Sequence, residues 1–165
     1  TTFNYSSGSD ALVSVDSKGN ETGIETITGF NTGSDKIDLS ALGLNVSGGI
    51  GVVDASKSSD ATAVFTKIAS GKASETELSS LKNLFTAGSD TTYLPPSNGG
   101  TSSPSGDFAA TVVSLGNGNN LLFVNNAGST GFNASQDSVI SLSAAKGSTP
   151  GADSTDWAQA LVLSK

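Results

Sequence analysis

The chain has 165 residues, a net charge of −7 and an isoelectric point near 4.2; it contains no cysteine, histidine or methionine, and all eight of its basic residues are lysine. This composition excludes from the chain a Ser-His-Asp triad, a cysteine nucleophile, a zinc site built on histidine or cysteine, and an arginine finger. The acidic charge argues against nucleic acid or an anionic membrane as a partner. Any bound metal needs oxygen ligands, which favours calcium or magnesium.

The length fits one domain. No apolar run approaches the roughly 18–20 residues of a membrane-spanning helix, so no membrane span is expected. The first residues, Thr1 to Tyr5, include no methionine, no basic region and no apolar signal core. We therefore expect the chain to be a processed or excised piece of a longer protein.

The first 50 residues alternate short apolar strings with turns rich in Gly, Ser, Asn and Asp. Residues 11–15 and 24–28 are predicted strands, and residues 17–20 and 31–34 are predicted turns. Strands this short, separated by turns this frequent, are typical of a β-solenoid, a sandwich or a barrel.

Between residues 58 and 87 the apolar spacing changes to that of a helix. The first predicted helix is capped by Ser58 or Ser59 and ends at Gly71. The second opens with the capping box Ser74 to Glu77 and stops at Gly88. This pattern predicts a helical hairpin that covers a sheet.

Residues 89–107 are rich in Pro, Gly and Ser and are predicted to be a loop. Strands are predicted at 108–115, 121–125 and 138–143, with a hairpin turn at 116–119. From residue 154 the chain reads as a short amphipathic segment. The predicted core consists of Phe3, Leu12, Val15, Ile24, Ile27, Phe30, Ile37, Leu39, Leu42, Val64, Phe65, Ile68, Leu78, Leu81, Phe85, Val112, Leu122, Val124, Val139, Ile140 and Leu142.

Two stretches resemble the C-terminal domain of RTX-type bacterial proteins, which closes a calcium β-roll and is exported by type I secretion. Gly8-Ser9-Asp10-Ala11-Leu12 matches the second half of the calcium-binding nonapeptide G-G-x-G-x-D-x-U-x. The segment from Thr26 to Leu42, with its Asp-Lys-Ile-Asp-Leu-Ser core, is similar to the roll-closing segment of serralysin-type proteases, adhesins and surface-layer proteins. Phe3-Asn4-Tyr5 resembles the last roll strand, and residues 121–143 are a weaker echo of the family's closing strands.

The resemblance implies a mainly β fold with a short β-roll-like start, antiparallel strands and an inserted helical hairpin. One domain is expected overall, with a roll-closing lobe at 1–50, the helical hairpin and Pro/Gly-rich loop at 51–107, and β strands with a secretion-signal-like tail at 108–165. The chain departs from the family where the loop after residue 124 carries Asn125-Asn126 without carboxylates. It also lacks the zinc motif of the proteases, so their catalysis does not carry over.

Calcium is the expected cofactor, and its candidate ligands lie in three turns. Asp10 belongs to the nonapeptide-like turn, Asp16, Asn20 and Glu21 surround a second turn, and Asp35 and Asp38 flank Lys36 in the roll-closing segment. Carboxylate and carbonyl oxygens of this kind are the ligands that calcium prefers. For each turn the alternative is a purely structural one; in the roll-closing segment Lys36 would then pair with Asp35 or Asp38 on the surface.

The tail resembles the uncleaved C-terminal signals of type I exporters, because an acid precedes a mostly apolar run. The candidate signal residues are Asp156, Trp157, Ala160, Leu161, Val162 and Leu163. The alternative is a last helix or strand that docks on the core, and both roles are compatible once the chain has folded.

These features together favour a non-catalytic, calcium-associated capping and export domain of a secreted bacterial surface protein, of the surface-layer or adhesin kind. The expected partners are an upstream β-roll of the same parent chain, a type I exporter and further copies in a surface lattice. The main alternative is a carbohydrate- or protein-binding module at the cell surface, for which Tyr93 and Trp157 are the candidate aromatic platform. An enzyme with paired carboxylates is the third reading.

Overall fold

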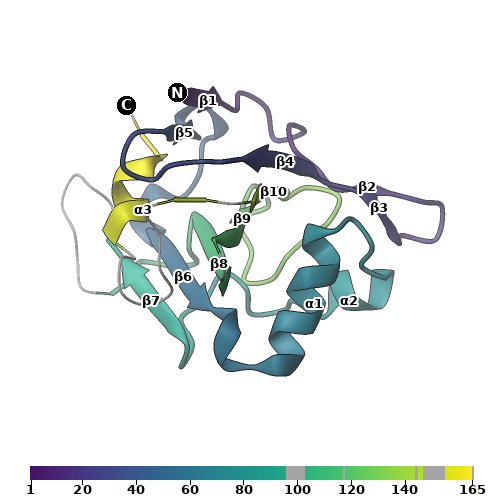
Figure 1. Cartoon of the computed structure of the whole chain (residues 1–165). Coiled ribbons are helices and arrows are strands. Elements are labelled where there is room, and N and C mark those ends of the chain that lie inside the picture. The colour runs from purple at the N-terminus through teal and green to yellow at the C-terminus, as the bar shows by residue number, and fades with distance from the viewer. Residues whose placement is uncertain (96–102, 117, 144, 147–154, 165) are drawn as a thin grey trace.

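A six-stranded mixed sheet forms the centre of the computed structural model, which describes residues 1–95, 103–116, 118–143, 145–146 and 155–164 (Figure 1). Its strands follow the order β4-β10-β9-β8-β6-β7. The pairs β4–β10 and β6–β8 are parallel, and the other neighbours are antiparallel. The strands are β4 (Glu25–Thr28), β6 (Ile50–Asp54), β7 (Thr91–Leu94), β8 (Ala110–Gly116), β9 (Asn119–Val124) and β10 (Ser138–Ser143).

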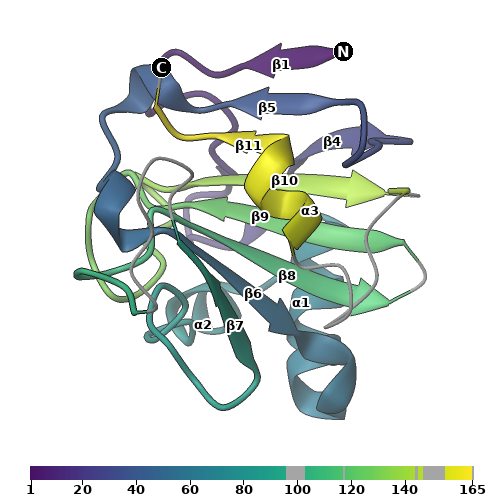
Figure 2. The ribbon, with the colours of Figure 1, turned by 90° about the vertical axis from the view of Figure 1, so that its left-hand side faces the viewer.

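A smaller, wholly parallel sheet lies over one face of the first, with β5 (Lys36–Asp38) between β1 (Thr2–Asn4) and β11 (Leu161–Val162). Figure 2 shows its three strands stacked from β1 at the outer edge to β11 beside the six-stranded sheet. A separate hairpin, β2 (Ser14–Val15) and β3 (Glu21–Gly23), extends from the body of the molecule.

Three α-helices belong to the described residues. α1 (Ser59–Ala69) and α2 (Glu75–Ser79) cover the other face of the six-stranded sheet, and α3 (Thr155–Ala160) precedes β11 (Figures 1 and 2). Three short 3-10 turns join strands or lead into α1: η1 (Ser40–Leu42), η2 (Val46–Gly48) and η3 (Ala55–Lys57). The chain is therefore mainly β with few helices, as the turn-rich sequence predicts.

Two apolar cores result from the alternation of side chains along the central strands. On β9, Leu122 and Val124 face the small parallel sheet and α3, whereas Leu121 and Phe123 face α1 and α2. All four side chains are fully buried. Because both faces of the sheet are covered, the central strand β9 carries a continuous apolar run from Leu121 to Val124 and not a strict alternation.

The predicted core is largely confirmed, with one clear exception at the hairpin. Val15 is 46% exposed, because β2 belongs to a two-stranded ribbon that has no second sheet packed on it. Within the described residues, no helix is long and apolar enough to cross a lipid bilayer.

The second predicted helix is much shorter than its apolar pattern suggests. It ends at Ser79, well before the expected stop at Gly88. The residues beyond it hydrogen-bond to distant backbone: the Phe85 N–H donates to the Thr130 carbonyl at 2.9 Å, and the Phe132 N–H donates to the Leu81 carbonyl at 2.9 Å. These tertiary bonds replace the continuing helix.

A strand also occurs where the sequence predicts only a loop. Residues 91–94 form β7, which pairs with β6 at the sheet edge. Its three exposed or half-buried residues carry little apolar signal, and only Leu94 is fully buried. Part of the predicted loop, residues 96–102, and position 117 of the predicted hairpin turn lie outside the described residues.

The capping box at the start of α2 has the predicted geometry. The Ser74 hydroxyl accepts from the Glu77 N–H at 3.1 Å, and the Glu77 carboxylate accepts from the Ser74 N–H at 3.1 Å. Ser74→Ala is therefore expected to lower the free energy of unfolding by about 1 kcal/mol. Urea denaturation of both proteins measures this; unchanged stability in the variant would show that the box contributes nothing beyond solvent bonding.

Candidate functional site

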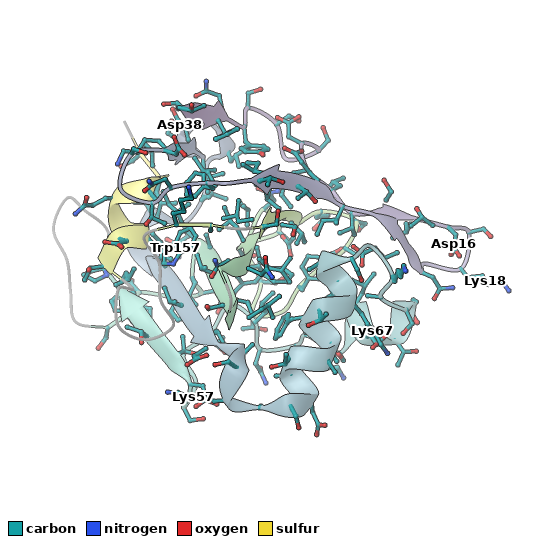
Figure 3. All side chains as sticks on the ribbon, in the orientation of Figure 1. Asp16, Lys18, Asp38, Lys57, Lys67 and Trp157 are labelled. Atoms are coloured by element: carbon teal, nitrogen blue, oxygen red, sulfur yellow. The ribbon has the colours of Figure 1, made fainter. Side chains whose placement is uncertain are left out.

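The C-terminal tail docks on the segment between β4 and β5 and on β5 itself. The indole of Trp157, labelled in Figure 3, is 2% exposed. It lies parallel to the ring of Phe30, with centroids 6.1 Å apart and an interplanar angle of 3°. Ala160, Leu161 and Leu163 are buried as well. The docking alternative for the tail is thus the folded arrangement, as a short helix followed by a strand.

β11 completes the small parallel sheet through backbone bonds. Leu161 is in register with Ile37, and the Leu39 N–H donates to the Val162 carbonyl at 2.8 Å. The Lys36 ammonium donates to the carbonyl of Gln159 at 2.6 Å, at the last turn of α3. The Lys36 ammonium thus contacts the carbonyl end of a helix, where a cation is favoured.

Asp10 organises the nonapeptide-like turn through its own neighbours. One carboxylate oxygen, Oδ2, accepts from the N–H groups of Ser6 and Ser7, both at 3.0 Å. The Asp10 N–H donates to the Ser7 carbonyl at 2.9 Å. Ser6 and Ser7 stand where the nonapeptide has its second glycine and the residue after it, and their backbone N–H groups thus donate to the carboxylate.

Asp16 and Asn20 close the tip of the β2–β3 hairpin. Oδ1 of Asp16 accepts from the N–H groups of Lys18 at 2.9 Å and Asn20 at 3.0 Å. These backbone bonds, that from Asn20 foremost, lower the pKa of the Asp16 carboxyl. Oδ1 of Asn20 accepts from the Glu75 N–H at 3.0 Å, which ties the hairpin to the first residue of α2.

Asp35 and Asp38 are likewise engaged locally. Oδ2 of Asp35 accepts from the Asn31 N–H at 2.9 Å and closes the turn that leads into β5. Asp38 is buried, and its Oδ1 accepts from the N–H of Ser40 at 3.0 Å and from the hydroxyl of Ser40 at 2.5 Å. This contact holds the first residue of η1.

The candidate calcium ligands do not converge. Figure 3 shows Asp38 beside the small parallel sheet and Asp16 at the far tip of the hairpin. Among the residues that the structure describes, no three carboxylate side chains come close enough to hold a metal ion. A resident calcium ion is not supported by this donor set, and calcium remains a prediction for the domain in its parent chain.

Three further polar residues have structural roles. Glu21 was expected near a metal, and Asp137 and Asn126 were not among the expected site residues. Glu21, expected at an oxygen-rich turn, is buried and its pKa is raised to about 7, because burial outweighs a bond from the Ala73 N–H. Asp137 is fully buried and clamps the loop after β9 through the N–H groups of Ala127 and Asn133. Asn126 joins that loop to the Gly8 turn. Sequence spacing carries no signal for such long-range contacts.

Burial also raises the pKa of the Asp137 carboxyl, against the lowering effect of its backbone donors. The group acts as a structural acceptor for a loop. Comparison of the chain with protein-family models, with characterised proteins and with solved structures gives no match.

Proposed function

We propose that this domain is the non-catalytic cap of a calcium β-roll in a secreted bacterial surface protein, of the surface-layer or adhesin kind, and that its tail is the type I export signal. Its partners in this role are the upstream roll of the parent chain, the exporter and neighbouring copies in a surface lattice. The calcium ions belong to the upstream coils, where repeated acidic turns face one another.

The order in which the chain visits the two sheets carries the proposal. It runs from β1 in the small sheet to β4 in the large one, back to β5, and later from β10 to β11. Within each sheet, every one of these strands is parallel to the previous one: β5 to β1, β11 to β5, and β10 to β4. This is the path of solenoid coils, interrupted between β5 and β10 by the strands and helices of the insertion.

The two ends of this coil differ. At one end, β1 and β4 are edge strands of their sheets, and both lie at the same end of the molecule (Figures 1 and 2). At the other end, strands β9, β8, β6 and β7 extend the large sheet beyond the last coil; they pair antiparallel except for β6 with β8. A cap needs one end that continues the repeat and one that terminates it.

The open edge of β1 has the polarity that a further parallel coil requires. The Tyr5 N–H donates to the Asp38 carbonyl at 3.0 Å, and the Thr1 carbonyl accepts from the Lys36 N–H at 2.8 Å. Because successive residues of a strand point their backbone groups to opposite sides, those of Thr2 and Asn4 face away from β5. An upstream strand can pair with them in parallel.

The alternative is a binding module at the cell surface. A surface hollow favours it, but the exposed aromatic platform expected for a sugar site is not formed by Trp157 or Tyr93. Trp157 is buried, and Tyr93 is half-buried against Phe108. A hollow of about 680 Å³ lies between the hairpin, α2 and residues 129–135, with the exposed Val15 at its margin. A peptide fits such a surface better than a sugar does, since sugar sites usually present a flat exposed ring.

The test is export of the full parent protein by its own bacterium. Replacing residues 160–163 by serine removes the apolar run that the exporter would contact, and the protein is expected to accumulate in the cells. Phe65→Ala, in the helical layer away from the tail, is the matched control for lost stability. Equal amounts of the serine variant and the native protein in the culture medium would contradict the signal and leave the tail a structural element.

A further inference from the structure

We propose that the roll-like turn from Ser6 to Asp10 is locked by two protein side chains, Asn126 and Ser138, in the place where a calcium β-roll would hold its ion. The inference rests on the proposed function only for the comparison of this turn with the turns of a calcium β-roll. It concerns how the last coil is joined to the closing strands, which lie more than 100 residues further along the chain.

Asn126 and Ser138 supply hydrogen-bond donors to the turn. Nδ2 of Asn126 lies within hydrogen-bond distance of three acceptors and shares its two hydrogens among them: the Gly8 carbonyl at 3.3 Å, the Gln136 carbonyl at 3.1 Å and the Ser138 hydroxyl at 2.9 Å. That hydroxyl in turn donates to the Asp10 carbonyl at 2.6 Å. The carbonyls of Gly8 and Asp10, at the two ends of the Gly-x-Asp stretch, therefore accept hydrogen bonds from side chains.

The orientation of the Asn126 amide follows from these partners. Two carbonyl oxygens and a hydroxyl that is already donating surround Nδ2, and all three can only accept there. The opposite assignment would bring Oδ1 against two carbonyls. Oδ1 itself has no protein partner.

The same donors make the turn a poor cation site. Calcium takes 6–8 oxygen ligands, commonly with several carboxylates. Here an amide and a hydroxyl direct hydrogens to the turn, and Oδ2 of Asp10 already accepts two N–H groups. Asp137, the carboxylate next to Ser138 in sequence, has its Oδ1 and Oδ2 engaged by Ala127 and Asn133.

Backbone contacts extend the lock into the central sheet. Leu12 forms an antiparallel bridge with Ser138, and the Val139 N–H donates to the Ala11 carbonyl at 2.8 Å. The residues that follow the turn are thus paired with the first residues of β10. The turn is fixed to the closing strands by the protein itself, so the last coil closes without a metal.

The test is thermal unfolding of the domain in excess calcium and in excess EGTA. Asn126→Ala is expected to lower the melting temperature by about 4–10 °C, and by the same amount in both buffers, because the bonds of Nδ2 to Gly8, Gln136 and Ser138 are lost. Asn83→Ala, an exposed asparagine elsewhere, is the matched control and should change little. Ser138→Ala removes the bond to the Asp10 carbonyl and one acceptor of the Asn126 amide, and it serves as the milder variant if Asn126→Ala does not fold.

Two results would overturn the lock. One is an unchanged melting temperature for both Asn126→Ala and Ser138→Ala. The other is a calcium-dependent rise of the native protein that disappears in Asp10→Asn, since this would place the ion at the turn. A rise that survives Asp10→Asn places calcium elsewhere and, together with the loss in Asn126→Ala, supports the lock. None of these results depends on export.

Discussion

Trp157→Ala is expected to lower the free energy of unfolding by about 3–5 kcal/mol, the usual cost of truncating a large buried aromatic side chain. The indole is the largest fully buried side chain among the described residues. It fixes α3 on the core by lying parallel to Phe30, and α3 in turn positions β11 beside β5. Loss of the ring therefore weakens the small parallel sheet as well as its own contacts.

Chemical denaturation of the isolated domain, followed by circular dichroism, measures this effect. Gln159→Ala is the matched control, because Gln159 is exposed on the same helix and only its backbone carbonyl is used, by Lys36. Combining Trp157→Ala with Phe30→Ala should cost about 0.5–1.5 kcal/mol less than the sum of the two single losses, because each single variant already removes the contact between the rings. A loss below 1 kcal/mol for Trp157→Ala would mean that the tail is not held in this position.

Local features were predictable from the sequence because neighbouring residues determine them. The capping box at Ser74, the strand at 138–143 and the hairpin around Gly116 depend on patterns a few residues long. For the apolar tail after Asp156, docking as a helix or strand is the alternative to an export signal, and in the folded chain the tail forms a helix followed by a strand. Each of these elements follows from a local rule that no distant contact overrides.

Elements that depend on distant partners were not predictable in this way. α2 stops at Ser79 because Phe85 bonds to Thr130, and β7 exists because β6 lies beside it. The sheet order places β5 between β1 and β11, strands from opposite ends of the chain. Spacing along one sequence does not contain these pairings.

The candidate site shows the same division. The acidic residues of the three turns were identified, and each does organise a turn. Their partners were not, since the donors that occupy the Gly8 turn come from Asn126 and Ser138. The sequence departure at Asn125-Asn126, where carboxylates were expected, is the one signal that points to this substitution of side-chain donors for a metal.

Glu21 is expected to make the stability of the domain depend on pH. Its side chain is 6% exposed, and its backbone N–H donates to the Ala73 carbonyl at 2.8 Å. Oε1 accepts from the Ala73 N–H at 3.2 Å, while Oε2 has no hydrogen-bond partner. Burial of the carboxylate raises its pKa from 4.5 to about 7. The ionised form is therefore the costly one in the folded protein.

The direction of the pH effect follows from proton binding. Between pH 4.5 and about pH 7 the folded state holds a proton on Glu21 that the unfolded state has released, so this group's contribution to stability falls as the pH rises through that window and stays low above it.

Glu21→Gln removes the titration while keeping an acceptor for the Ala73 N–H. Above pH 7 the variant is expected to be more stable than the native protein by roughly 2–3 kcal/mol, and near pH 4 the two should be alike. Urea denaturation across this range measures the difference, in which the shared titration of Asp137 and the surface acids cancels. Glu75→Gln, at an exposed residue of α2, is the control and should leave the pH profile unchanged. A difference between Glu21→Gln and the native protein that does not vary with pH would show that Glu21 stays ionised throughout and that its neighbours solvate it.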